Sequence, residues 1–207
     1  DFETLPNQFV IKATHASSYN LIVSDKKDLH KTKTKLLFKK WLNKNQYYRT
    51  GQEWAYKDLK PKLIAEKYLK EDNETSLIDY KFYCFKGVAK FIEVHLDRAD
   101  NHKRAFYDLD FKILPFRNVA LKKSIDKEIE KPSTLNEMIR LSEILADKLP
   151  FVRVDFYSIS NKIIFGEMTF YPSDGRKDFY PEKYNRSIGD LFELPRLLKN
   201  QREVTEI

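Results

Sequence analysis

Two pairs of alternating segments, each joined by a two-residue turn, constrain the fold of this 207-residue chain more than any other feature. In the first pair, DYKFYCF and AKFIEVHL flank Lys86-Gly87. In the second, FVRVDFYSI and KIIFGEMTF flank Ser160-Asn161. Alternation with a period of two is typical of strands, and a two-residue connection is a strong hairpin signal. The sequence therefore predicts two antiparallel β-hairpins.

The remaining segments add short strands and helices around these hairpins. RAFYDLDF is predicted to continue the sheet, EDNETS is a polar loop, and Ser133 is a plausible helix N-cap. Strands are predicted at 9–12, 20–23 and 62–69, and helices at 28–45 (apolar Leu29, Leu36, Leu37 and Trp41), 135–149 and 188–198. The chain is thus predicted to be a mixed α+β protein dominated by antiparallel hairpins.

Composition excludes several classes of protein. A chain with 42% hydrophobic and 14% aromatic residues is no disordered tail, and its longest apolar runs are too short to span a bilayer. The single cysteine, Cys84, excludes a disulfide framework and a cysteine-rich zinc site, and we expect a buried reduced thiol. These features favour a cytoplasmic protein. Because the first residue is Asp1, we expect that an N-terminal region of the full-length protein is missing.

The net charge of +7 favours an anionic partner, although the lysines of KTKTKLLFKKWLNK fit a solvated helix face equally well. The second hairpin is more specific. Alternation puts Arg153 and Asp155 on one face and Glu167 and Thr169 on one face of the returning strand, with Gly166 allowing close approach. Asp155 then lies opposite or diagonal to Glu167, and two adjacent carboxylates repel unless one is protonated or a cation such as Mg²⁺ lies between them. The same spacing also fits charges on the solvent face of an amphipathic hairpin.

RVDFY followed by GEMTFYPSDG resembles the metal-binding hairpin of the ATP-grasp superfamily. Together, LPNQFVIKATH, DYKFYCFKG, FVRVDFY and FGEMTFYP resemble the TupA-like ATP-grasp family more narrowly, over about residues 5 to 185. That family is named for a protein of teichuronopeptide biosynthesis, and its members are frequent in polysaccharide gene clusters. The resemblance implies an ATP-grasp fold across 1–207. It also implies two antiparallel-sheet subdomains with flanking helices, about 1–70 and 70–207, with the nucleotide between them.

The resemblance also assigns site residues. It implies that Asp155 and Glu167 hold magnesium together with Thr169, which stands where Asn is usual, and that Arg153 meets the transferred phosphoryl group. Lys103 and Arg104 are further candidates for binding the γ-phosphate or an acidic substrate. The implied nucleotide-binding residues are Lys12 at a strand end, His15, Ser17 and Ser18 in a glycine-free phosphate loop, Glu66, Lys67, Tyr68 and Leu69 in the adenine hinge, and Asp79 and Lys81 on the following hairpin.

The implied function is an ATP- and Mg²⁺-dependent ligase that joins a carboxylate to an amine through an acylphosphate. The expected partners are ATP, an acidic carboxylate substrate such as a uronic acid of a polysaccharide or its precursor, and an amine or amino acid, with no nucleic acid and no membrane span. Two alternatives stay open: a basic nucleic-acid-binding module, and a catalytically degenerate ATP-grasp scaffold. The strand acids Asp79, Glu93 and Asp155 argue against the first, because they repel phosphate unless a metal intervenes.

Overall fold

The computed structural model describes residues 1–49, 51–70, 77–96, 102–119, 125 and 129–193. The chain divides into two compact units, Asp1–Leu69 and Lys70–Ile207, and each unit is described by itself. No helix among the described residues has both the length and the hydropathy that a membrane crossing requires.

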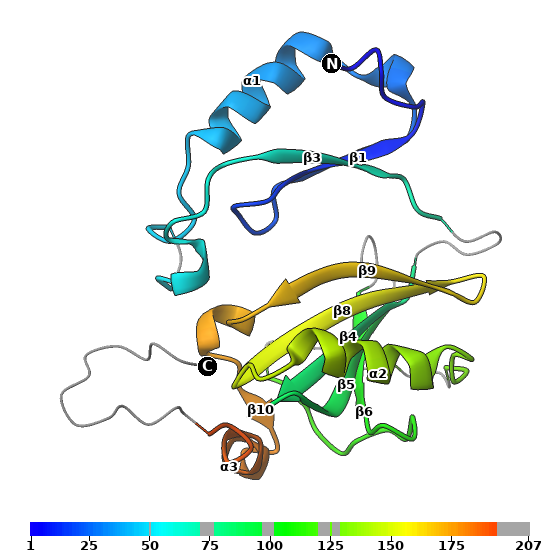
Figure 1. The fold of residues 1–207 in the computed structure, drawn as a ribbon, viewed down its shortest axis with the longest axis vertical. Coiled ribbons are helices and arrows are strands. Elements are labelled where there is room, and N and C mark those ends of the chain that lie inside the picture. Colours follow the sequence, from blue (N-terminus) through cyan, green and yellow to red (C-terminus); the bar gives the residue numbers. More distant parts are fainter. Residues whose placement is uncertain (50, 71–76, 97–101, 120–124, 126–128, 194–207) are drawn as a thin grey trace. The chain divides into compact units, whose positions relative to one another are not determined.

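The first unit is a three-stranded antiparallel sheet covered on one face by a helix (Figure 1). The strand order is β2-β1-β3. Its elements are β1 (Phe9–Ala13), β2 (Asn20–Val23), η1 (Lys26–Asp28), α1 (Lys31–Leu42), η2 (Trp54–Tyr56) and β3 (Leu63–Lys67). Alternate residues of β1, namely Phe9, Ile11 and Ala13, are buried. Phe9 and Ile11 pack with Val23 and the partly buried Phe38 of α1.

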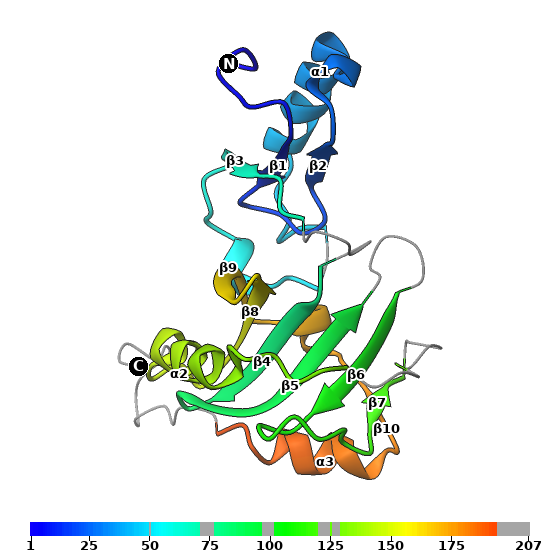
Figure 2. The ribbon, with the colours of Figure 1, turned by 90° about the vertical axis from the view of Figure 1, so that its right-hand side faces the viewer.

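The second unit is built on a five-stranded antiparallel sheet with the order β6-β5-β4-β8-β9 (Figure 2). A two-stranded sheet, β10-β7, and two more helices complete it. Its elements are β4 (Asp79–Phe85), β5 (Val88–Leu96), β6 (Lys103–Tyr107), β7 (Arg117–Asn118), α2 (Leu135–Ala146), β8 (Phe151–Ile159), β9 (Lys162–Thr169), η3 (Pro172–Gly175), β10 (Phe179–Tyr180) and α3 (Lys183–Gly189).

Both predicted hairpins are confirmed. Lys86-Gly87 joins β4 to β5 and Ser160-Asn161 joins β8 to β9, and all four turn residues have positive φ, as a two-residue hairpin turn requires. Gly87 is also needed for packing, because a Cβ there would lie 1.9 Å from the carbonyl oxygen of Asp147. The tight turns fix the register of the sheet, and the register decides which side chains share a face.

The two faces of the large sheet carry different side chains. One face packs on α2 through Phe82, Val154 and their neighbours, and it includes the buried thiol of Cys84. At one end, the opposite face is covered by aromatic residues that pack against α3, among them Tyr83, Phe91 and Phe106. The rest of this opposite face is charged, and we call it the charged face. Its residues are Asp79, Lys81, Glu93, His95, Arg104, Arg153, Asp155 and Glu167.

Three predictions from the sequence were wrong in detail. Ser133 does not cap α2: the N-cap position is Thr134, and the Ser133 hydroxyl donates to Asn161 Oδ1 at 2.6 Å instead. Leu36 does not contribute to a buried helix face, because 63% of its surface is exposed while Trp41 is buried. The last described helix covers Lys183–Gly189, earlier than the predicted 188–198. Residues 194–198, like the EDNETS loop at 71–76, lie outside the described residues.

Candidate active site

The second hairpin places three oxygen-bearing side chains around one guanidinium group. Asp155 lies directly opposite Glu167, and Arg153 lies opposite Thr169. Arg153 Nε donates to Asp155 Oδ1 at 2.7 Å, and Arg153 Nη2 donates to Asp155 Oδ2 at 2.8 Å. The same Nη2 also donates to Glu167 Oε1 at 3.0 Å and to Thr169 Oγ1 at 2.9 Å. We call these four residues the hairpin cluster, and its oxygens converge on a single cation.

A β-bulge at Gly166 shapes this cluster. Asp155 pairs with Glu167 and Phe156 with Phe165, so Gly166 is the extra residue of β9. A Cβ on Gly166 would lie 3.1 Å from the carbonyl oxygen of Asp155, which is closer than most side chains tolerate. Glycine therefore lets the bulge approach the Asp155 backbone closely, and the bulge keeps Glu167 beside Asp155 while the rest of the hairpin stays in register.

The charges of the hairpin cluster perturb one another. Burial opposes ionisation of Asp155, but the Arg153 guanidinium and the Lys81 ammonium together hold the pKa of this carboxyl below its usual value. The pKa of Glu167 is raised, by partial desolvation and then by the Asp155 carboxylate across the strand pair. The raised pKa of Glu167 beside a second carboxylate indicates that a further cation would be favourable there.

Lys81 and Asp79 support the hairpin cluster from β4. Lys81 Nζ lies 2.7 Å from Asp79 Oδ2 and also forms an ion pair with Asp155, and all three side chains are at most 3% exposed. A buried ammonium with two carboxylate partners fixes the position of Asp155. In this structure Asp79 and Lys81 therefore hold the Asp155 carboxylate of the hairpin cluster in place.

A second group of charged residues lies on the same face and centres on Glu93. Tyr83 Oη donates to Glu93 Oε2 at 2.7 Å, and Lys177 Nζ donates to the same oxygen at 2.6 Å and to Tyr83 Oη at 2.5 Å. Arg104 Nη1 and His95 Nε2 each lie 3.3 Å from Glu93 Oε1. We call these five residues the Glu93 cluster. Glu93 is fully buried, and Lys177 is 8% exposed.

Burial shifts the pKa values in the Glu93 cluster strongly. Desolvation lowers the pKa of Lys177 to about 8, against the attraction of Glu93. It also lowers the pKa of His95 to about 4, so His95 is neutral at pH 7. Although burial opposes its ionisation, the hydrogen bond from His95 and the charge of Lys177 hold the pKa of Glu93 well below its usual value. At neutral pH the cluster therefore holds two cations and one carboxylate.

The structure separates the two basic residues predicted on β6. Arg104 pairs with His95 and lies on the charged face, whereas Lys103 pairs with Leu96, which belongs to the core on the α2 side. Successive strand residues point to opposite faces, so Lys103 and Arg104 cannot bind the same anion from this strand. Only Arg104 joins the residues of the charged face.

In the first unit, Lys12 and Glu66 form an ion pair on the exposed face of the small sheet. Lys12 Nζ lies 2.5 Å from Glu66 Oε2, and each side chain is about one-third exposed. The register puts Ile22 and Ile64 on this same face, where they are 61% and 42% exposed. This face thus offers apolar side chains next to a cation.

The glycine-free loop between β1 and β2 is held to α1. His15 is buried, and its Nε2 lies 3.0 Å from the carbonyl oxygen of Trp41. The Tyr19 ring stacks on Trp41 with the centroids 5.4 Å apart. Ser17 and Ser18 stay exposed at the tip of the loop, and Ser18 adopts a φ of 65°, a conformation more usual for glycine. His15 therefore anchors the loop in this structure, while Ser17 and Ser18 are accessible.

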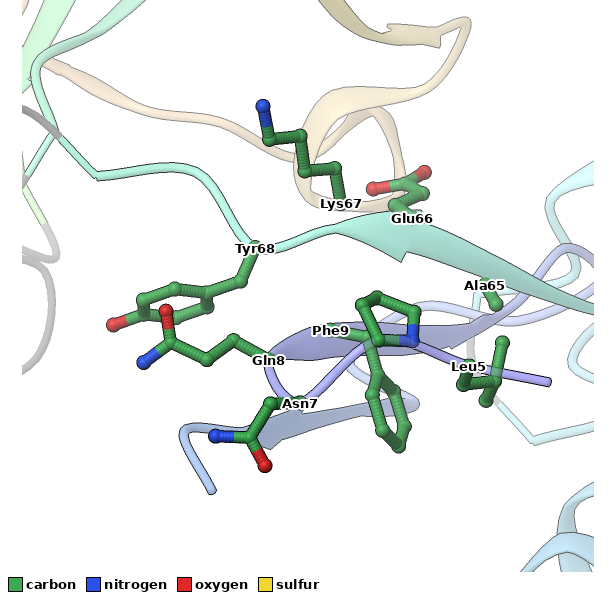
Figure 3. A pocket seen from close by; sticks show the side chains of 9 residues that line it. Leu5, Asn7, Gln8, Phe9, Ala65, Glu66, Lys67 and Tyr68 are labelled. Atoms are coloured by element: carbon green, nitrogen blue, oxygen red, sulfur yellow. The ribbon is translucent and has the colours of Figure 1, made fainter. Parts of the chain in front are cut away.

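The predicted hinge lines a pocket of about 600 Å³ in the first unit (Figure 3). Glu66, Lys67 and Tyr68 belong to its wall, but Leu69 does not. The segment before β1 forms the other side, and the figure shows Gln8 beside Tyr68 at one end of the pocket. This volume is within the range of small-molecule sites.

Sequence reasoning missed most of the Glu93 cluster. Glu93 and His95 alternate with apolar residues in AKFIEVHL, so their shared face was readable. Lys177 follows a turn in which Ser173, Asp174 and Gly175 all have positive φ, and no periodicity places its side chain. The charges were visible in the sequence, but the partner that each one contacts was not.

Comparison with known proteins places this geometry in a family. The model of the TupA-like ATP-grasp family matches residues 1–193. The chain belongs to that family. The ATP-grasp fold predicted from the sequence is thereby confirmed for this TupA-like protein. No curated protein sequence matches the chain.

Solved structures similar to this TupA-like protein include D-alanine–D-alanine ligase from Bacillus anthracis. The ATP complex of that ligase has a TM-score of 0.47 and 16% sequence identity, with 93% of this chain and 53% of that chain covered. N5-carboxyaminoimidazole synthase from Aspergillus clavatus, solved with ADP and 5-aminoimidazole ribonucleotide, has a TM-score of 0.41 and 12% identity, with 81% and 34% covered. The chain thus spans about half the length of the ligase.

Proposed function

We propose that the chain is the ATP-binding part of a Mg²⁺-dependent ligase that joins a carboxylate to an amine. In this reaction a carboxylate oxygen of the substrate attacks the γ-phosphorus of ATP, the bond to ADP breaks, and an acylphosphate forms. The amine nitrogen then attacks the acyl carbon and phosphate leaves, which gives an amide. The observation that carries the proposal is the convergence of Asp155, Glu167 and Thr169 on one cation in a chain of this family.

The hairpin cluster suits a magnesium ion that shares its ligands with a nucleotide. No group of three or more His, Cys, Asp or Glu residues that could hold a metal exists in the described part of the chain, so an all-protein cage does not form there. Two carboxylates and a hydroxyl are instead the small ligand set that Mg²⁺ uses when phosphates complete its coordination. When bound, Mg²⁺ would neutralise phosphate oxygens at this site.

The residues of the second unit would bind and orient the reacting groups. Asp155 and Glu167 would hold the metal, with Thr169 as a weaker third ligand. Arg153 already donates to both carboxylates, and its guanidinium would turn to phosphoryl oxygens, whose charge it is suited to stabilise. Lys81 would keep Asp155 in place through their buried ion pair.

The residues of the first unit would hold the nucleotide. Lys12 would contact phosphate, and the exposed Ile22 and Ile64 beside it would pack on the flat base or ribose. Ser17 and Ser18 offer hydroxyl and backbone N–H donors to phosphate oxygens. The pocket lined by Glu66, Lys67 and Tyr68 is the place for the adenine edge.

We propose an acidic sugar of a polysaccharide or its precursor as the carboxylate, and an amino acid or another amine as the nucleophile. Membership of a family named for teichuronopeptide biosynthesis supports this choice. The net charge of +7 is compatible with an anionic acceptor in addition to ATP.

Calorimetric titration of the purified chain with ATP tests the proposal. Binding is expected with Mg²⁺ and at least tenfold weaker without it, and Glu167→Gln is expected to remove most of the dependence on Mg²⁺. Glu182→Gln, an exposed Glu beside α3, is the matched control and should bind ATP like the wild type. If the affinity for ATP changed neither on removal of Mg²⁺ nor in Glu167→Gln, the metal assignment would be wrong. Binding of DNA or RNA instead of ATP would favour a nucleic-acid-binding module.

The complete reaction has its own readout. Phosphate release with D-glucuronate and an amino acid, followed by mass spectrometry of the conjugate, tests ligation. Tight binding of Mg²⁺-ATP without turnover on any acidic sugar and amine would instead indicate a scaffold.

A further inference from the structure

Arg104 on β6 has few partners for a guanidinium inside a protein. Its Nη1 donates to Glu93 Oε1 at 3.3 Å, a long hydrogen bond. Its Nε is buried and has no hydrogen-bond partner among the described residues. The side chain is still 22% exposed, so a small molecule can reach it. Buried N–H groups normally find an acceptor, so the hydrogen-bonding capacity of this guanidinium is only partly used.

Glu93 already accepts hydrogen bonds from three donors, and none of them is Arg104 Nε. Its Oε2 accepts hydrogen bonds from Tyr83 and Lys177 at 2.7 and 2.6 Å. Its Oε1 is shared between Arg104 and His95 at 3.3 Å. With His95 neutral, the Glu93 cluster holds two cations against one carboxylate, and so it lacks one negative charge. One further carboxylate would balance it.

The register relates this site to the hairpin cluster. Arg104 and Asp155 are both on the charged face, and β6 lies three strands from β8 in the order β6-β5-β4-β8-β9. With about 4.8 Å between neighbouring strands, their backbones are about 14 Å apart. A ligand of the size of a sugar or an amino acid can extend from one cluster toward the other on this face.

We propose that Arg104 binds a second carboxylate of the substrates, one that is not phosphorylated. The proposal rests on the proposed ligase function and adds a substrate requirement: one of the two molecules joined carries an additional carboxylate. The planar guanidinium matches a carboxylate with two parallel N–H donors. A phosphate dianion fits less well, because its second negative charge would have no counter-charge next to buried Glu93.

Nuclear magnetic resonance of the histidine rings tests this inference in the absence of nucleotide. His95 lies opposite Arg104, and its Nδ1 lies 3.1 Å from His102 Nε2, so both rings report on the site. Glutarate is the probe, and uncharged glutaramide and inorganic phosphate are the comparisons. Glutarate is expected to shift the two signals with saturation at about millimolar concentration, whereas glutaramide should not.

Substitutions then assign the effect to Arg104. Arg104→Gln should weaken glutarate binding by roughly tenfold or more. Arg104→Lys should weaken it as well, because a lysine keeps the positive charge but lacks the two parallel N–H donors of a guanidinium. Arg140→Gln, an exposed arginine on α2, is the matched control and should bind like the wild type. Arg104→Lys keeps a cation beside Glu93, which makes it informative even if Arg104→Gln fails to fold.

Three results would overturn the inference: no saturable shift with glutarate in the wild type, undiminished binding by Arg104→Lys, or a response to phosphate as strong as the response to glutarate. ATP binding is measured separately on the wild type. Saturable glutarate binding in a protein that does not bind Mg²⁺-ATP would keep the carboxylate subsite and reject the ligase function.

Discussion

The hairpin cluster and the Glu93 cluster occupy the same face of one sheet and both combine carboxylates with basic side chains, yet they differ in charge and exposure. Together with Lys81 and Asp79, the hairpin cluster holds two cations against three carboxylates. The Glu93 cluster holds two cations against one carboxylate. Glu167 has a side chain that is 63% exposed, while Glu93 is fully buried.

The difference shows how one charged face can suit two ligands of opposite sign. Excess negative charge at an exposed site favours a metal ion, which can enter with its water and phosphates. Excess positive charge at a buried site favours one anion that fits closely. The largest consequence should be in stability, because a buried charge that loses its partner costs far more free energy than an exposed one.

Glu93→Gln should therefore give the largest effect. It removes the carboxylate from Lys177 and Arg104, and the free energy of unfolding should fall by about 3–5 kcal/mol. Glu167→Gln is the matched substitution in the hairpin cluster and should change it by no more than about 1 kcal/mol. Urea unfolding of both variants checks the difference, and equal losses would show that the two clusters do not differ in burial.

The pH dependence of Lys177 sharpens the same contrast. Its pKa in the folded chain is about 8, below the ordinary value near 10.4, so the unfolded state binds more protons between these values. Below pH 8 both states are protonated and the full cost of burying the charge is present. Between pH 8 and 10.4 the wild type should gain on the order of 3 kcal/mol relative to Lys177→Met. Urea unfolding of both proteins at several pH values measures this gain, and a constant difference would mean that Lys177 is not desolvated.

The sequence predicted the hairpin cluster better than the Glu93 cluster, for a physical reason. A two-residue turn and a period of two determine the register of β8 and β9, so Asp155 had to lie opposite or next to Glu167, as confirmed. The Glu93 cluster needs Lys177 from a segment without periodicity, and it needs the aromatic cover that buries Glu93. His15 shows the same limit: its place in the loop was readable, but its burial against the Trp41 carbonyl depends on how α1 packs.

A smaller effect is expected for metal affinity without nucleotide. Arg153→Met removes the guanidinium that now neutralises Asp155 and Glu167, so Mn²⁺ should bind about tenfold more tightly. Arg104→Met removes a cation from β6, a strand about 14 Å from β8, and should change the affinity less than about twofold because of screening. Electron paramagnetic resonance of free Mn²⁺ gives the Mn²⁺ affinity of each variant. If Arg104→Met raised the Mn²⁺ affinity as much as Arg153→Met, the two clusters would act as one electrostatic site.

The smallest effect should come from Thr169, whose hydroxyl is the weakest of the proposed metal ligands in the hairpin cluster. Its hydroxyl lies 2.9 Å from Arg153 Nη2 and 3.5 Å from Glu167 Oε1, close enough to join the same coordination sphere. Thr169→Asn supplies an amide oxygen, a stronger ligand for hard cations, and should tighten Mn²⁺ binding in the presence of ATP by about two- to fivefold. Thr169→Val keeps the shape without the oxygen and should weaken it by a similar factor. Equal affinities for Asn, Thr and Val would leave Asp155 and Glu167 as the only protein ligands, and the metal would then depend on phosphate oxygens for the rest of its shell.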